Sequence, residues 1–427
     1  MNSRIFRSAG LVFAVIILCI LCSAAAPLID MPSMRENAAQ GTAMLRDEYP
    51  VPKMIGGFKS AQLDNYTSVL MVKTAAYTGA ESYLHKAFGG MRTDMPAAEG
   101  QSDWEAYCTY ADGTLSPTQG LSYTRYWHGY TLALRLLLCV LNLANIQMLL
   151  YFVQTAMFVC VIVLMNRRGL KAIIPAFFTA YFLMMPFVMG MCLQFMTVSL
   201  PMLACCILLL KWDDAIDRMF SMPAFFAALG VLTNYVDLLT FPLVSLGFPL
   251  VLLLALRLQS RDSLPHLAVL AVACCVGWGV GFGGMWALKW IITGACFGWA
   301  RLHSILSQIF LRVSTESNGI SFTRMDAVRM NLDVILSKSS YLLILLISGA
   351  VSLLPAARRL LLEKHLHTDI RALIMLIPLA APFAWYIVMA NHSVDHAYYT
   401  YRGLAVCVFA ALSLAACLFE KKPDYAG

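Results

Sequence analysis

Charged residues are scarce in this chain: they make up 13% of its 427 residues, against 60% for hydrophobic ones. Soluble domains contain roughly 25% charged and 45–50% apolar residues, so the composition excludes an ordinary soluble enzyme. It also excludes a disordered chain, and the basic residues form no continuous patch of the kind that binds nucleic acid. The mean hydropathy of +0.70 over the whole chain predicts an all-α protein that crosses a membrane several times.

The motifs of common soluble enzymes are also missing. No P-loop, dinucleotide-binding glycine motif or nucleophile elbow occurs in its usual context. The chain has no internal repeat either, so it lacks a feature that many transporters carry. Function must therefore be inferred from polar residues near the ends of the apolar segments.

The apolar residues occur in runs that are long enough to cross a bilayer, which takes about 20 residues. We predict ten transmembrane helices, over residues 9–28, 145–166, 172–190, 194–211, 222–238, 241–257, 266–287, 340–357, 371–391 and 403–419. The run 129–142 is too short to span, and we expect it to form a helix in the membrane interface. The first span is either retained or removed as a signal peptide, because small residues follow its apolar core.

This layout divides the chain into five parts. They are a first transmembrane helix (1–28), a long outer loop with interfacial helices (29–144), transmembrane helices 2–7 (145–287), a second outer loop (288–339), and helices 8–10 with a tail (340–427). Lys and Arg gather at one set of helix ends, whereas the short loops near 191–194 and 238–241 contain neither. Because short loops rich in Lys and Arg stay in the cytoplasm, we predict that both termini are cytoplasmic and that the long loops lie outside.

Three acidic residues of the first outer loop are candidates for a catalytic base. Asp64 precedes a segment of helical character, so it is expected to be a helix N-cap, a base held at the membrane surface, or both. Asp47 and Glu48 form the only adjacent acidic pair of this loop, and Pro50 after them favours a solvated turn.

Basic and aromatic residues near the outer helix ends are candidates for binding a phosphorylated sugar. Arg125, Trp127 and His128 are interleaved with tyrosines in residues 122–130. This pattern is typical of an aromatic belt at the interface, and also of a site where rings stack on sugar and Arg pairs with phosphate. Lys289 lies close to two tryptophans and either extends to the headgroups or binds a lipid phosphate.

The last outer loop, residues 391–402, is unusually polar for its position between two spans. His392 and His396 are four residues apart and would share one face of a helix. A metal site needs three or four ligands, and only Asp395 is near these histidines. We therefore expect a phosphate or sugar-hydroxyl site, or residues that anchor the loop at the membrane interface, and no metal site. Whether a divalent cation takes part stays open. Asp237 ends the fifth span and faces either a cavity or water.

Several short stretches resemble uncharacterised bacterial membrane proteins: LDNYT (63–67), RYWHGY (125–130), TNYVDLLTFP (233–242), MWALKW (285–290) and NHSVDHAYYTYR (391–402). The layout of the chain is similar to that of the GT-C superfamily of membrane glycosyltransferases. In both, one span is followed by a long outer loop with acidic residues and interfacial helices, and then by further spans. The similarity covers roughly the first three hundred residues. Many members place an acidic pair soon after the first span, whereas here Asp30 stands alone there.

The resemblance implies that a sugar is transferred from a polyprenyl-phosphate donor to an envelope glycan or lipid acceptor. Transfer would occur at the outer face of the bacterial cytoplasmic membrane, with a first-loop carboxylate as base. We expect Asp64 to take this role. The donor phosphate would be bound by Lys289, Arg402 and Arg125, and the substrates would be contacted by Trp127, His128, Asp237, His392 and His396.

Two other hypotheses remain open at this point. A transporter or flippase of a lipid-linked substrate would use the polar residues near the membrane, which are Asn234, Gln194 and Asp237. A non-catalytic envelope-assembly protein would dock a partner on the 297–339 loop, whose arginines are Arg301, Arg312, Arg324 and Arg329.

Overall fold

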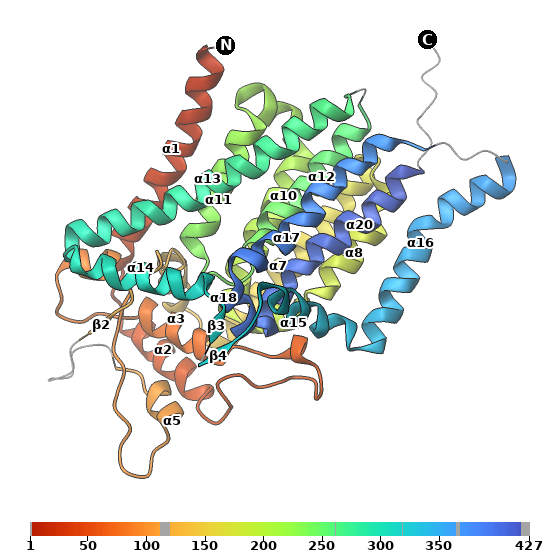
Figure 1. Cartoon of the computed structure of the whole chain (residues 1–427). Coiled ribbons are helices and arrows are strands. Elements are labelled where there is room, and N and C mark those ends of the chain that lie inside the picture. Colours follow the sequence, from red (N-terminus) through yellow and green to blue (C-terminus); the bar gives the residue numbers. More distant parts are fainter. Residues whose placement is uncertain (1, 112–119, 261, 318, 364–367, 420–427) are drawn as a thin grey trace.

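A computed structural model describes residues 2–111, 120–260, 262–317, 319–363 and 368–419 of the chain, and the predicted tail beyond 419 lies outside this range. The described part is almost entirely helical (Figure 1). Its strands are two short antiparallel pairs, β1 (Met91–Arg92) with β2 (Leu121–Ser122), and β3 (Glu316–Ser317) with β4 (Ile320–Ser321). The prediction of a helical chain rich in apolar segments is therefore confirmed.

Six helical segments of the described chain are long and apolar enough to cross a membrane. Four of them are single helices: α1 (Asn2–Ala25), which is extended to Leu28, α7 (Leu143–Arg167), α10 (Leu193–Met219) and α13 (Leu264–Phe297). The fifth is the stretch Ile370–Val388, which contains η4 (Ile370–Met375) and α17 (Leu376–Val388). The sixth is the stretch Ala397–Leu418, which ends in α20 (Leu404–Leu418). The pair α15 (Arg324–Leu336) and α16 (Ser339–Glu363), bent by 84°, makes a seventh if it is one span.

The other three predicted spans form shorter apolar helices. These are α8 (Ile174–Leu183), which follows η3 (Lys171–Ile173), α11 (Met222–Val236) and α12 (Leu243–Leu258). An apolar helix therefore lies in each predicted span, although two bounds differ. α13 continues to Phe297, beyond the expected end at 287. The span predicted over 172–190 is interrupted after α8, where Met185 has a φ of +57° and α9 (Pro186–Met191) begins. Ten transmembrane helices stay a prediction.

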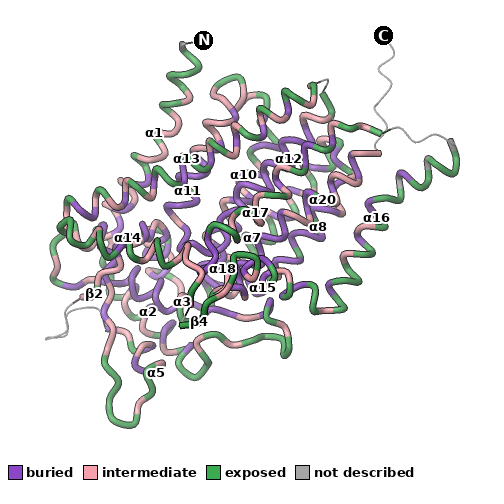
Figure 2. The backbone as a smooth tube through the Cα atoms, in the orientation of Figure 1, coloured by how far each residue is buried: buried purple, intermediate pink, exposed green. Residues whose placement is uncertain are grey.

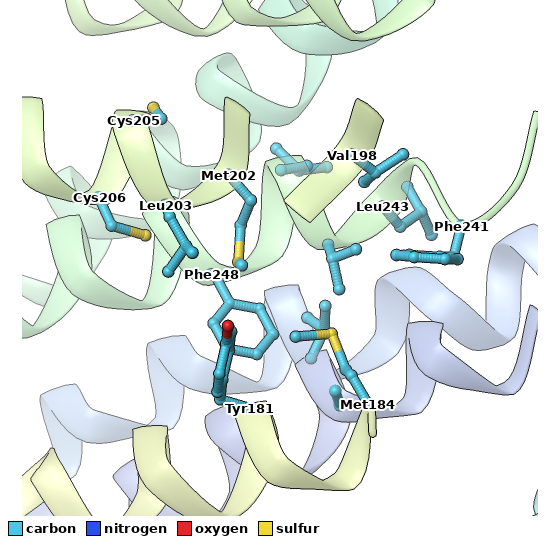
Figure 3. Close-up of a cluster of buried hydrophobic side chains, with 14 of the residues drawn as sticks. Tyr181, Met184, Val198, Met202, Leu203, Cys205, Cys206, Phe241, Leu243 and Phe248 are labelled. Atoms are coloured by element: carbon cyan, nitrogen blue, oxygen red, sulfur yellow. The ribbon is translucent and has the colours of Figure 1, made fainter. Parts of the chain in front are cut away.

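The core lies where α8, α10 and α12 pack together. Tyr181, Met202 and Phe248 extend from these three helices towards one another (Figure 3). Every residue of α12 from Leu243 to Leu256 is buried. Because α12 is buried on every face over this stretch, other helices surround it and it is the central helix of the bundle.

Apolar side chains also cover the outside of the bundle. On α13 the exposed valines Val269, Val272, Val276 and Val280 follow one another at helical spacing. Helices α1 and α16 are exposed over most of their length (Figure 2). Exposed apolar surface of this extent is typical of a protein that contacts lipid, which supports a location in a membrane.

The start of α1 and the end of α20 lie at the same end of the bundle (Figure 1). At this end Arg4 pairs with Asp217 of α10 at 2.7 Å, and Arg257 of α12 lies 3.5 Å from the same carboxylate group. The basic residues that predicted the cytoplasmic side thus gather with both termini. That this side is the cytoplasm stays a prediction.

Short helices gather at the opposite end, which we call the loop end. They are η1 (Ala26–Leu28), α2 (Pro32–Met44), η2 (Lys59–Ala61), α3 (Asn65–Ala75), α4 (Tyr83–Phe88), α5 (Asp103–Cys108), α6 (Thr131–Leu138), α9 (Pro186–Met191), α14 (Ala300–Val313), α18 (Ala390–Asp395), α19 (Ala397–Thr400) and η5 (Tyr401–Gly403). As expected for the 129–142 segment, α6 is too short to span a membrane.

Glycines bring α11 and α13 into backbone contact. A Cβ atom added at Gly281 would lie 2.0 Å from the Ala227 carbonyl oxygen, and one at Gly277 would lie 2.3 Å from that of Pro223. Three other glycines of α13 have no neighbouring atom within 4 Å: Gly279, Gly283 and Gly284. A Cβ atom at Gly230 of α11 would likewise lie 2.2 Å from the Trp278 carbonyl oxygen, so the close approach depends on glycines of both helices.

Candidate active site at the loop end

Asp64 is the N-cap of α3, as its sequence context predicts. Its Oδ1 accepts a hydrogen bond from the Thr67 N–H at 2.8 Å. Its Oδ2 accepts hydrogen bonds from the Tyr398 hydroxyl at 2.9 Å and from the Gln194 side-chain amide. Burial raises the pKa of Asp64 above its usual value of 3.8, although these hydrogen bonds act in the opposite direction. A carboxylate with a raised pKa accepts a proton more readily near neutral pH, which suits a general base.

Three segments that are far apart in the sequence build this carboxylate site. Asp64 belongs to the first outer loop, Gln194 to the start of α10, and Tyr398 to α19. Gln194 was selected from the sequence only as a transporter residue, and Tyr398 only as one of several tyrosines. Their hydrogen bonds to Asp64 span 130 and 334 residues, so no local pattern could identify them as its partners.

An apolar groove with a volume of about 260 Å³ lies between the first outer loop and α10. Leu193 and Met196 of α10 line this groove, and Gln194, which bonds Asp64, lies between them in the sequence. The α3 helix that Asp64 caps contributes Met71 to the same wall. Walls of this composition accommodate a hydrocarbon chain, and the helices that form them also position the carboxylate.

A second polar cluster joins the last turn of α14 to α18. The Arg312 Nη1 atom lies 3.1 Å from Nε2 of His396, whose ring stacks on Tyr399 with 5.1 Å between centroids. The His392 and His396 rings are 4.8 Å apart, so the two histidines do share one face. His392 donates from Nε2 to the Leu239 carbonyl at 2.6 Å. Burial, and next the charge of Arg312, lowers the pKa of His396 to about 4.

Three buried polar atoms of this cluster have no hydrogen-bond partner among the described residues: Nε of Arg312, Nδ1 of His392 and Oδ1 of Asn391. Arg312 also forms no ion pair with a carboxylate of the described chain. Buried polar atoms are normally paired. The Arg312 Nε is a donor that suits an anionic group. Oδ1 of Asn391, and Nδ1 of His392 whose Nε2 carries the proton, are acceptors that suit a hydroxyl group.

The carboxylate site and the Arg312 cluster are continuous. Tyr398, which donates to Asp64, lies 4.8 Å from the Tyr399 ring, and Tyr399 stacks on His396. A base and a cation are therefore linked through one group of contacting side chains. Sequence reasoning missed Arg312 as a site residue, because only the fold brings it to residues 392–399.

Two of the predicted phosphate-binding residues are fully buried. Arg402 donates from Nε to the Met184 carbonyl at 2.8 Å and from Nη1 to that of Tyr398 at 3.1 Å. Lys289 donates to the Phe88 carbonyl, so it does not extend to the headgroups. These contacts stabilise the packing of the surrounding segments, and a role in phosphate binding stays a prediction. Arg125 lies in a separate cavity, which is described below.

Trp127 and Asp237 are also buried, and each has a local structural contact. Trp127 donates from Nε1 to the Met285 carbonyl at 2.8 Å, which fixes the first outer loop to α13. Asp237 accepts hydrogen bonds from the Thr240 N–H at 3.0 Å and from its hydroxyl at 2.6 Å. It therefore closes the turn between α11 and α12, and at 3% exposure it is not solvated.

Asp47 and Glu48 lie in the exposed turn that the sequence predicts. Glu48 accepts a hydrogen bond from the Asn65 amide at 2.8 Å. This contact places the acidic pair close to the residue after Asp64. Neither residue has the buried environment that distinguishes Asp64, so their catalytic role stays a prediction with less geometric support.

His128 is buried, and both ring nitrogens have partners: the Tyr130 hydroxyl at 2.9 Å and the Tyr123 carbonyl at 2.8 Å. Burial lowers the pKa of His128 from 6.5 to about 3. Below pH 6.5 the His128 ring is therefore protonated in the unfolded chain but stays neutral in the native state. This difference should make the free energy of unfolding about 2 kcal/mol lower at pH 5 than at pH 7.5.

The prediction can be checked by thermal unfolding at pH 7.5 and pH 5 of the wild type and of His128→Asn. Asparagine cannot titrate, and it tolerates the backbone φ of +56° at this position. The variant should lose less stability than the wild type between these pH values, with the remaining loss due to groups such as His396. An equal loss in both proteins would contradict this interpretation.

In the described ranges, no group of three or more His, Cys, Asp or Glu is arranged to hold a metal ion. The site at the loop end is therefore a buried carboxylate, a guanidinium–histidine cluster linked to it through Tyr398 and Tyr399, and an apolar groove between α3, α6 and α10. No family model, no curated protein and no solved structure matches this chain.

Proposed function

We propose that this chain is a membrane glycosyltransferase of the GT-C type. It would transfer a sugar from a polyprenyl-phosphate donor to an envelope glycan or lipid acceptor at the outer face of a bacterial cytoplasmic membrane. The observation that carries the proposal is the position of Gln194. This residue bonds the buried Asp64 carboxylate, and its neighbours Leu193 and Met196 line the apolar groove. The same first turn of α10 therefore contributes to the environment of the base and to a surface for a hydrocarbon chain.

In the proposed reaction the polyprenyl chain lies in the groove and the sugar lies near Asp64. The acceptor hydroxyl oxygen forms a bond to C1 of the sugar while the bond from C1 to the phosphate oxygen breaks. The phosphate leaves with the electron pair, and Asp64 takes the acceptor proton. Phosphate is a good leaving group, so no strong general acid is required.

Arg312 is the cation that we assign to the departing phosphate. Its unpartnered Nε and its Nη1, which now contacts His396, are donors that phosphate oxygens accept. The guanidinium would stabilise the charge that develops on the phosphate as the glycosyl bond breaks. Contacts through His396, Tyr399 and Tyr398 link Arg312 to Asp64.

The transporter and docking hypotheses have less support. Gln194 and Asp237, which a transporter would offer to its substrate, are engaged by Asp64 and Thr240. Arg312, which a docking loop would present to a partner, is directed to His396. Transfer activity of the isolated chain would separate these hypotheses.

A groove-filling substitution tests the proposed donor site. Thr197 of α10 lines the groove, and Leu208 of the same helix is exposed on the outside of the bundle. Thr197→Trp should lower sugar transfer by about tenfold or more, because the indole occupies the space of the donor chain. Leu208→Trp, the matched control, should transfer like the wild type.

Transfer is measured in nanodiscs with radiolabelled glucose, mannose and arabinose, each linked to polyprenyl phosphate, and with envelope extracts as acceptors. If the wild type transfers none of these sugars, the proposed function fails for these donors. If transfer occurs and Thr197→Trp equals the control, the function stands and the assignment of the groove is wrong.

A further inference from the structure

A small polar cavity lies at the loop end between β2 and the first turns of α14. Its volume is about 180 Å³. Arg125 and Arg301 line it together with four hydroxyl-bearing residues, which are Ser122, Tyr123, Thr124 and Ser304. No carboxylate contributes to its walls.

Neither arginine is neutralised by a carboxylate of the described chain. Arg301 donates to the Ser122 hydroxyl, and the Arg125 guanidinium lies 5.3 Å from the centroid of the Tyr123 ring. Two guanidiniums and several hydroxyls around one cavity create a positive site rich in hydrogen-bond donors. Phosphate oxygens match such a site because Arg can donate two parallel hydrogen bonds to them.

The position of α14 places this cavity at a membrane surface. The helix follows α13, a candidate membrane span, and runs across its end (Figure 1). It exposes Leu306, Phe310 and Leu311 and buries Ile305, as an amphipathic helix does when it lies in the interface. Trp299, just before it, is 60% exposed and fits an aromatic belt at the headgroups.

We infer that this cavity binds the phosphate group of an anionic phospholipid in the adjoining leaflet. The phosphate oxygens accept hydrogen bonds from Arg125 and Arg301. A zwitterionic headgroup is disfavoured, because its ammonium group would meet two guanidiniums and no carboxylate in the cavity wall. Inorganic phosphate has the same oxygens, but it lacks the acyl chains that would lie against the apolar face of α14.

This lipid site is distinct from the proposed donor site, and the inference does not depend on sugar transfer. Arg301 is in the first turn of α14 and Arg312 is in its last turn, so they are about 16 Å apart at 1.5 Å per residue. A lipid bound at one end would hold the helix whose other end contacts His396. The assignment of Arg125 changes accordingly, from the donor phosphate to a structural lipid.

Native mass spectrometry of the full chain, equilibrated with equal amounts of phosphatidylglycerol and phosphatidylcholine, tests the inference. The wild type should retain phosphatidylglycerol at least about tenfold more than phosphatidylcholine. The double variant Arg125→Gln/Arg301→Gln should lose this preference, and Arg125→Lys/Arg301→Lys should keep part of it. The control Arg46→Gln/Lys53→Gln removes the same charge from exposed positions of the first loop and should behave like the wild type.

Three results would overturn the inference. An anionic-lipid site in this cavity would be excluded if the wild type retained both lipids equally. It would also be excluded if Arg125→Gln/Arg301→Gln kept the wild-type preference for phosphatidylglycerol. Displacement of phosphatidylglycerol by millimolar inorganic phosphate, with bound phosphate in its place, would show a site for a soluble anion. Thermal unfolding of each variant checks that a lost preference is not caused by misfolding.

Discussion

Replacing Asp64 by Asn is expected to lower the rate of sugar transfer by about 10²–10⁴-fold, the range that a general base contributes. Asparagine caps a helix about as well as aspartate does, so α3 should still begin at the same residue. The loss would then come from the missing proton acceptor. Transfer and thermal unfolding are measured on the same preparations, and unfolding should change little compared with transfer.

The matched control is Asp47→Asn, which removes a carboxylate from the exposed turn of the same loop. It should transfer at the wild-type rate. Transfer by the wild type should also fall as the pH decreases, because only ionised Asp64 accepts a proton. Since burial raises the pKa of Asp64, this fall should begin at a higher pH than for an ordinary aspartate. Full activity of Asp64→Asn would refute the assignment of the base.

Replacing Gly281 by Ala is expected to destabilise the bundle by about 1–3 kcal/mol, because the added methyl group would overlap the backbone of α11. Its Cβ would lie 2.0 Å from the Ala227 carbonyl oxygen. Backbone atoms cannot move aside as a flexible side chain can, so the two helices must separate. The measurement is the thermal unfolding temperature in detergent, together with the yield of monodisperse protein.

Gly283→Ala supplies the control on the same helix. No atom lies within 4 Å of the position where its Cβ would be. Alanine favours a helix over glycine by about 1 kcal/mol, so this variant should be as stable as the wild type or more stable. If Gly281→Ala and Gly283→Ala unfold at the same temperature, α11 and α13 are not in the close contact described above.

The helices and part of the site could be predicted because they depend on local patterns. Each predicted span contains a run of apolar residues, and an apolar helix forms there. The N-cap role of Asp64 follows from the helical segment after it, and the shared face of His392 and His396 follows from their spacing. Glycines let helices approach closely, but only the fold tells which glycines of α13 take part in such a contact.

The remaining features depend on contacts between distant segments. Arg312 meets His396 across 84 residues, and Gln194 meets Asp64 across 130. Lys289 has the sequence context of a residue that extends to headgroups, yet it points to the Phe88 carbonyl. Periodicity and spacing within one segment carry no information about such pairings, so these residues could be selected as polar but their partners could not.

The burial of Arg402 has a consequence for the precision of the site. This guanidinium donates to the carbonyls of Met184 and Tyr398, and the hydroxyl of Tyr398 donates to Asp64. Arg402 therefore fixes the backbone of the residue whose side chain orients the base. It acts as a positioning residue for Asp64 without touching the carboxylate itself.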